Sequence, residues 1–153
     1  MSTAHEMDPD VERAIYRAAE NEPLARTFSM RLLKLGPGYS LVEMPYNPET
    51  MANIYARAHG GAIFSLIDEA FETASQTGGN IAVALNVNVT YVSSPSEAAT
   101  LRAEAREISC SRKTASYDIK VTDGSGQIIA TCQAVAYRTG KPLAFAHEPA
   151  CRK

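Results

Sequence analysis

The chain has 153 residues, 45% of them hydrophobic and 21% charged, which fits one globular domain and excludes a disordered chain. The 15 Lys and Arg side chains against 17 Asp and Glu give a formal net charge of −2, which excludes a strongly basic nucleic-acid-binding protein. No apolar run approaches the roughly 20 residues that cross a bilayer. The first ten residues lack the features of a signal peptide and the three cysteines are widely spaced. We therefore expect a cytoplasmic protein that binds neither membrane nor nucleic acid.

The first half of the chain predicts a helix and a hairpin. Asp8 and Pro9 are typical of a helix start, and apolar residues recur at helical spacing over 9–20 until Asn21-Glu22-Pro23. Alternating apolar and polar residues then predict the two strands of a hairpin, at 28–32 and 39–44. A loop is predicted after the hairpin, at 47–58.

The second half predicts one long helix and then only strands. Ile63, Ile67 and Phe71 lie on one helical stripe, so an apolar helix is predicted from Gly60 to about Gln76. Four strands with short links are predicted over 83–91, 100–108, 115–122 and 127–138. Short links favour antiparallel neighbours, and an apolar helix needs a sheet to cover it. The predicted fold class is therefore α+β, with one curved sheet around one helix.

The domain organisation follows from these elements. We predict an N-terminal helical segment at 1–25, the main domain at 26–140 and a loose C-terminal tail at 141–153.

Two glycines, Gly60 and Gly61, open the long helix. Backbone N–H groups at a helix start, with the positive end of the helix dipole behind them, suit the oxyanion that develops during acyl transfer. Glycines at such a position also occur simply because a tight turn needs small residues, and the spacing leaves this alternative open.

Asp68 lies on the shoulder of the buried face of this helix, where a carboxylate is partly desolvated and its pKa is raised. Ser65 and Glu69 are expected to point to solvent, and Glu72 shares the flank of Asp68. Asp68 lies seven residues, or about 10 Å along the axis, beyond Gly61. Two such helices related by a two-fold axis would bring the two groups together, so we predict a site shared between subunits.

Asn53, His59, Gly60, Gly61 and Asp68 together carry a resemblance to a known family. The chain resembles the hotdog-fold acyl-CoA thioesterases of the phenylacetate-pathway (PaaI-like) type over roughly residues 26–138.

The resemblance implies a hotdog fold and a role for each matching residue. Asp68 is the expected general base or nucleophile, and the Gly60 and Gly61 amides form the oxyanion hole. Asn53 positions the carbonyl or the attacking water, and His59 supports the loop. Members of the family form dimers or dimers of dimers, so a homo-oligomer, such as a homotetramer, with sites at the dimer interface is expected.

Three departures from the family pattern are visible. The family has glycine where this chain has Ala56, a change that narrows the loop. Ser94-Pro95 places the proline one position late, and Ala98-Ala99 replaces a glycine and an acid. The last two affect a turn rather than the chemistry.

The basic pair Arg112 and Lys113 lies in a link between two strands. It is either a solvated turn or, as the resemblance implies, a clamp for the phosphates of coenzyme A; Arg57 and Arg138 are weaker candidates for that clamp. Coenzyme A enters as part of the acyl-CoA substrate, and no cofactor is expected.

Other chemistries find less support. The histidines His5, His59 and His147 lack metal-ligand spacing, so no metal site is expected. Cys110 and Cys132 are expected to be small buried hydrophobes rather than nucleophiles.

The predicted function is hydrolysis of an acyl-CoA to a free acid and coenzyme A. Two alternatives stay open: a hydratase or dehydratase, which needs an acid–base pair, and an acyl-CoA-binding or regulatory module without turnover. The acyl group depends on which large side chains line the pocket, the candidates being Tyr46, Met51, Phe71 and Tyr91.

Overall fold

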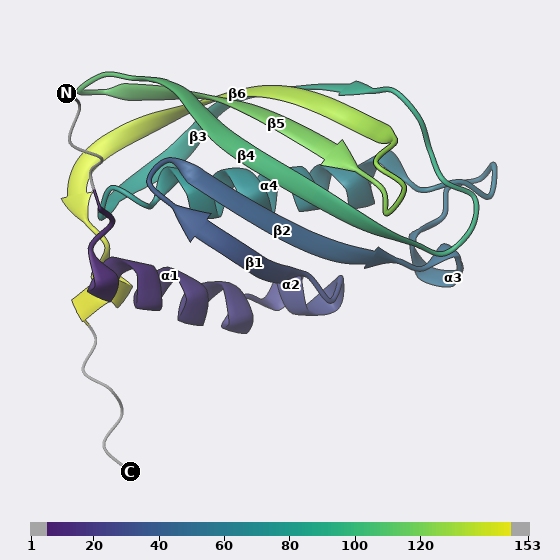
Figure 1. Cartoon of the computed structure of the whole chain (residues 1–153), viewed down its shortest axis with the longest axis horizontal. Helices are drawn as coiled ribbons and strands as arrows, with labels where there is room; N and C mark the ends of the chain where they lie inside the picture. Colours follow the sequence, from purple (N-terminus) through teal and green to yellow (C-terminus); the bar gives the residue numbers. More distant parts are fainter. Residues whose placement is uncertain (1–5, 148–153) are drawn as a thin grey trace, which may run out of the picture.

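The computed structural model describes residues 6–147, which form one antiparallel sheet curved around a long helix (Figure 1). The elements in chain order are α1 (Pro9–Asn21), α2 (Pro23–Thr27), β1 (Arg31–Gly36), β2 (Tyr39–Tyr46), α3 (Pro48–Met51), α4 (Gly60–Ser75), β3 (Asn80–Tyr91), β4 (Ala99–Cys110), β5 (Thr114–Thr122), β6 (Ile128–Pro142) and the 3₁₀ turn η1 (Ala144–His147). The predicted α+β class is confirmed. None of the helices in residues 6–147 is long and apolar enough to span a membrane.

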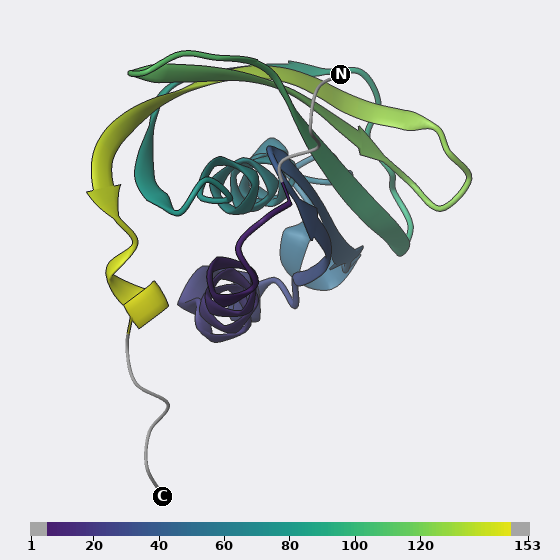
Figure 2. The ribbon, with the colours of Figure 1, turned by 60° about the vertical axis from the view of Figure 1, so that its left-hand side comes forward.

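The sheet has six strands in the order β1-β2-β4-β5-β6-β3, and all neighbours are antiparallel. The two edges are therefore β1 and β3. Figure 2 shows α4 in the hollow of the curved sheet, with α1 below it and η1 beside α1. The long helix thus lies between the sheet and the N-terminal helix.

Small side chains on the inner face of the sheet allow α4 to pack closely against it. Six of the buried residues of the central strands β4, β5 and β6 are alanines with 0–3% of their surface exposed: Ala103, Ala105, Ala115, Ala130, Ala134 and Ala136. Leu66, Ile67 and Ala70 of α4 are completely buried against them. The ring of Phe71 meets Tyr117 of β5 edge to face, with centroids 5.3 Å apart.

Side-chain hydrogen bonds fix the C-terminal half of α4 to the strands. The Gln76 amide donates to the Ala82 carbonyl at 2.9 Å and accepts from the Ala82 N–H at 3.0 Å. Ser40 Oγ donates to the Ala70 carbonyl at 2.6 Å. These buried bonds set the position of the helix relative to β2 and β3.

The prediction for the N-terminal half of the chain was wrong in three details. Pro23 ends α1 but also occupies the first position of a second helix, α2, which was not predicted. Residues 28–30 belong to the exit from α2 rather than to β1, and Ser29 has a φ of 54°. The predicted loop at 47–58 contains the short helix α3.

The predicted loose tail was also wrong over its first part. β6 continues to Pro142, Leu143 is 1% exposed, and its N–H donates to the Gly79 carbonyl at 3.2 Å. The apolar side chain of Leu143, which lies between α1 and β3, therefore anchors this segment. The rest of the tail, 148–153, lies outside the described residues, and the predicted domain boundaries stay predictions.

Candidate active site

His59 is the N-cap residue of α4. Its Nδ1 accepts a hydrogen bond from the Gly61 N–H at 2.8 Å, and its carbonyl accepts from the Ala62 N–H at 3.0 Å. The Gly61 amide, one of the two predicted oxyanion donors, is therefore bonded to His59. The Gly60 N–H has no acceptor within residues 6–147, as is usual for the first N–H groups of a helix.

Both glycines lie close to neighbouring side chains. A Cβ at Gly60 would lie 3.2 Å from Cζ of Tyr91, whose hydroxyl donates to the Gly60 carbonyl at 3.1 Å. A Cβ at Gly61 would lie 3.1 Å from Nδ1 of His59. The end of β3 thus contacts the start of α4.

Asn53 organises the loop that leads into α4. Its Oδ1 accepts from the N–H groups of Tyr55 at 2.9 Å and Arg57 at 3.2 Å. Ala56 in this loop has a φ of 56°, a conformation that favours glycine, which accounts for the glycine of the family pattern. Arg57 donates to the Ser94 carbonyl at 2.8 Å, so its guanidinium holds the loop to the segment after β3.

Asp68 lies half buried on α4, as predicted. Burial raises the pKa of its carboxyl group, and the charge of Glu22 raises it further. Asp68 in turn contributes to the raised pKa of the Cys132 thiol, whose main cause is burial.

The prediction for Glu69 was wrong. Its side chain is 5% exposed and faces Glu22, at the end of α1, instead of solvent. Burial, a hydrogen bond to Glu22 and the nearby charges of Glu22, Glu72 and Asp68 raise its pKa to about 9. Desolvation beside α1, followed by the charges of Glu22 and Asp68, also raises the pKa of Glu72, although this side chain is largely open to solvent.

A cationic cluster formed by Arg112, Lys113 and Arg138 lies at the C-terminal end of α4, opposite the end that begins at Gly60. Lys113 Nζ is 3.3 Å from the Tyr137 hydroxyl, and Arg138 donates to the Ser111 carbonyl at 2.8 Å. An Arg138 nitrogen would lie 3.6 Å from a Cβ at Gly78, just beyond α4. No ion pair within residues 6–147 neutralises this cluster.

Cys110 borders the cationic cluster and is exposed, which corrects the expectation that it is buried; Cys132 is buried as predicted. The Arg138 guanidinium lies 3.0 Å from Cys110 Sγ.

The hollows within residues 6–147 include one of about 450 Å³ lined by Arg57, Ser94 and Asp123, and two larger ones. One of these two, of about 620 Å³, lies on the polar outer face of the sheet and contains none of the predicted site residues. The other, of about 530 Å³, is lined by α1, α4, the start of β3 and residues 143–145. Of the candidate pocket residues, Tyr46, Met51 and Phe71 are buried in the core, and Tyr91 is half exposed.

Comparison with known proteins identifies the family. The model of the thioesterase superfamily matches residues 55–130. A provisionally named esterase of Archaeoglobus fulgidus is 36% identical over 86% of this chain and 84% of its own length. The acyl-coenzyme A thioesterase PaaI of Escherichia coli is 27% identical over 79% of this chain and 86% of its own length.

Solved structures agree with the sequence comparison. The E. coli PaaI structure matches 92% of this chain and 99% of its own, with a TM-score of 0.82 and 25% identity. A Streptococcus mutans protein bound to acetyl CoA matches 74% of this chain and 91% of its own, with a TM-score of 0.70 and 28% identity. The chain therefore belongs to the thioesterase superfamily, as a thioester hydrolase with the PaaI-like hotdog fold.

Proposed function

We propose that this chain hydrolyses acyl-CoA thioesters to a free acid and coenzyme A, at a site shared by two copies of the chain. Family membership supports thioester hydrolysis, and relatives named for, or solved with, coenzyme A derivatives support acyl-CoA as the substrate. The proposed chemistry uses water and the chain's own groups, without a metal or redox cofactor.

Asp68 is the proposed base or nucleophile, because its half-buried carboxylate is less solvated and more basic than an exposed one. As a base, it takes a proton from water while the water oxygen adds to the thioester carbonyl carbon. As a nucleophile, a carboxylate oxygen adds to that carbon, and water then cleaves the resulting anhydride. In both routes the C–S bond breaks, and coenzyme A leaves as a thiol after it takes up a proton.

The Gly60 N–H is the proposed donor to the oxyanion, since it has no acceptor within the described residues. The Gly61 N–H becomes a second donor when His59 turns away from it. Asn53 is proposed to position the carbonyl or the attacking water indirectly, through the loop that its side chain organises.

The shared site is supported by distances along α4 and by the edge of the sheet. Within one chain, Gly60 and Asp68 are about 12 Å apart along the helix axis. β3 is an edge strand of 12 residues with exposed Val83 and Leu85, which are 47% and 60% exposed. A long, apolar edge strand presents unpaired backbone groups that another strand can bind, and β3 of a second copy, in antiparallel orientation, provides that strand.

Such pairing puts the start of one β3 beside the end of the other. Tyr91, at the end of β3, contacts Gly60, whereas the start of β3 follows the C-terminal end of α4. Asp68 of one copy then approaches Gly60 of the other, and the cationic cluster of one copy approaches the same site. Arg112 and Lys113 are the proposed contacts to the phosphates of coenzyme A, in a dimer or a dimer of dimers.

The test of this function is turnover by Asp68→Asn, which keeps the size of the side chain and removes the base. We expect kcat for phenylacetyl-CoA and hexanoyl-CoA to fall about 100-fold or more. Asp10→Asn, at an exposed position of α1, is the matched control and keeps wild-type rates. Near wild-type hydrolysis by Asp68→Asn with native elution would refute the role of Asp68, and binding of acyl-CoA without turnover by the wild type would favour a binding module.

A further inference from the structure

A groove of about 530 Å³ is lined by residues of α1 and α4, two helices that Figure 2 shows below the sheet. Its walls are mostly apolar: Ile15 and Ala18 from α1, Ile81 from β3, and Leu143 and Phe145 from the C-terminal segment. Ligand pockets usually have volumes of about 300–1,000 Å³, and a cavity of about 150 Å³ already holds a benzene ring. The groove is therefore large enough for an aryl group or a medium-length aliphatic chain.

Asp68 is not among the residues that line this groove, but it lies close along α4 to one that does. Glu72 lines the groove and follows Asp68 by four residues, so the two lie one helical turn apart on one face of α4. Glu22 lines the opposite wall, and its charge acts on Asp68. A thioester carbonyl held at Asp68 thus has an apolar channel within one helical turn of it.

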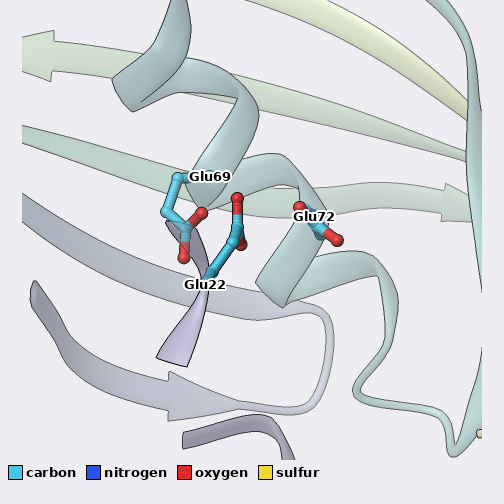
Figure 3. Close-up of side chains that lie close together, drawn as sticks. All are labelled: Glu22, Glu69 and Glu72. Carbon is cyan, nitrogen blue, oxygen red and sulfur yellow. The ribbon is translucent and has the colours of Figure 1, made fainter. Parts of the chain in front are cut away.

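Three acidic side chains lie together beside the groove, and two of them, Glu22 and Glu72, line it. The carboxylate oxygens of Glu22, Glu69 and Glu72 lie within 4.8 Å of one another, and Figure 3 shows Glu22 between the other two. No Lys or Arg forms an ion pair with them in residues 6–147. A further negative charge placed here is repelled, whereas an uncharged group or a hydrogen-bond donor is accepted.

We propose that the groove receives the acyl group of the substrate, and that Glu22 and Glu72 make it select uncharged aryl or medium-length acyl groups over those that end in a carboxylate. This inference rests on the proposed function. It assigns the acyl group to a groove formed by α1 and the C-terminal segment, and not to the buried residues Tyr46, Met51 and Phe71.

The charge part of the proposal is tested with hexanoyl-CoA and adipyl-CoA, which have acyl chains of equal length and differ in a terminal carboxylate. For the wild type we expect kcat/KM for adipyl-CoA to be about 100-fold below that for hexanoyl-CoA. The double variant Glu22→Gln/Glu72→Gln removes the repulsion at constant size and lowers this ratio at least about 10-fold. Equal kcat/KM values in the wild type, or an unchanged ratio in the variant, would overturn the selection by charge.

The location is tested with Ala18→Phe, which fills the groove from an exposed position of α1. We expect kcat/KM for hexanoyl-CoA and phenylacetyl-CoA to fall about 10-fold or more relative to that for acetyl-CoA, whose short acyl group reaches little of the groove. Glu20→Phe, exposed on the same helix and outside the groove, is the control and retains the wild-type ratio.

Each other outcome has a distinct meaning. If Ala18→Phe lowers kcat/KM equally for all three thioesters, the acyl group does not lie in the groove. A change of oligomeric state with an unchanged ratio would make the groove a contact between copies and overturn the inference as well. A wild type that hydrolyses none of the thioesters would refute the proposed function itself, whereas one that hydrolyses them with no effect of Ala18→Phe would refute only the groove.

Discussion

The buried carboxyl group of Glu69 makes the stability of the protein depend on pH. In the folded chain its pKa is raised to about 9, whereas an unfolded glutamate ionises near 4.5. Between these values the folded state holds a proton that the unfolded state releases, so a rise in pH favours unfolding. The stability that the protonated form contributes is complete below about pH 4.5 and is lost as the pH rises towards 9.

The magnitude follows from proton linkage. One proton difference changes the free energy of unfolding by about 1.4 kcal/mol per pH unit, or about 3 kcal/mol between pH 6 and pH 8. Glu69→Gln is neutral at every pH and lacks this dependence. The variant is therefore expected to gain about 3 kcal/mol relative to wild type over that interval, or roughly 6–12 °C in Tm for a chain of this size.

The assay is urea unfolding of both proteins at pH 6, 7 and 8, at one protein concentration. Glu20→Gln, an exposed glutamate on α1, is the matched control and is expected to follow the wild type. Parallel pH profiles for wild type and Glu69→Gln would show that the carboxyl group ionises normally, and the account of the cluster between α1 and α4 would be wrong.

Three further results are expected from other parts of the molecule. Replacing Arg112 and Lys113 by alanine is expected to raise KM for acyl-CoA far more than KM for a pantetheine thioester, which lacks the nucleotide phosphates. Equal effects on both KM values would mean that the pair belongs to a solvated turn and does not bind phosphate. His59→Ala removes the acceptor of the Gly61 N–H and is expected to lower the free energy of unfolding by about 1 kcal/mol. His59→Asn, which supplies a good N-cap residue, is expected to retain the wild-type stability in thermal unfolding. Equal losses in the two variants would contradict the role of His59 as the N-cap. Leu85→Lys charges the exposed edge of β3, so size-exclusion chromatography should show dissociation and the assay lost activity; an active dimer would contradict pairing through β3.

Most of the fold could be predicted because its signals are local. Alternating alanines in the strands and the apolar stripe of α4 depend on neighbouring residues only. The exceptions have physical causes. Pro23 both ends one helix and starts another. Leu143 is buried by α1 and β3, which are distant from it in the sequence, so the residues around Leu143 do not indicate its burial.

The site was predictable where it is continuous in the chain. His59, Gly60 and Gly61 form a helix start whose chemistry depends on adjacent backbone atoms. Glu69 was placed in solvent because a helical stripe describes only its own helix, whereas Glu22 reaches this face from the end of α1. The groove between α1 and α4 has no sequence pattern at all, since residues from four separate segments line it.

The central claim is that Asp68 of one copy acts with the helix start of another. The test mixes two inactive parents, Asp68→Asn and Gly60→Pro. Proline removes the N–H donor but suits the first position of a helix, and His59 before it has the extended backbone that proline requires. The exposed ring of Tyr91 has to shift by a few tenths of an ångström, so native elution of each parent is checked first.

Unfolding and refolding equal amounts of the two parents gives about half mixed dimers, in each of which one site combines an intact Asp68 with an intact Gly60. We expect roughly a quarter of wild-type hydrolysis to return. No recovery in well-folded mixed dimers would mean that each site is built within one chain, and would contradict the account.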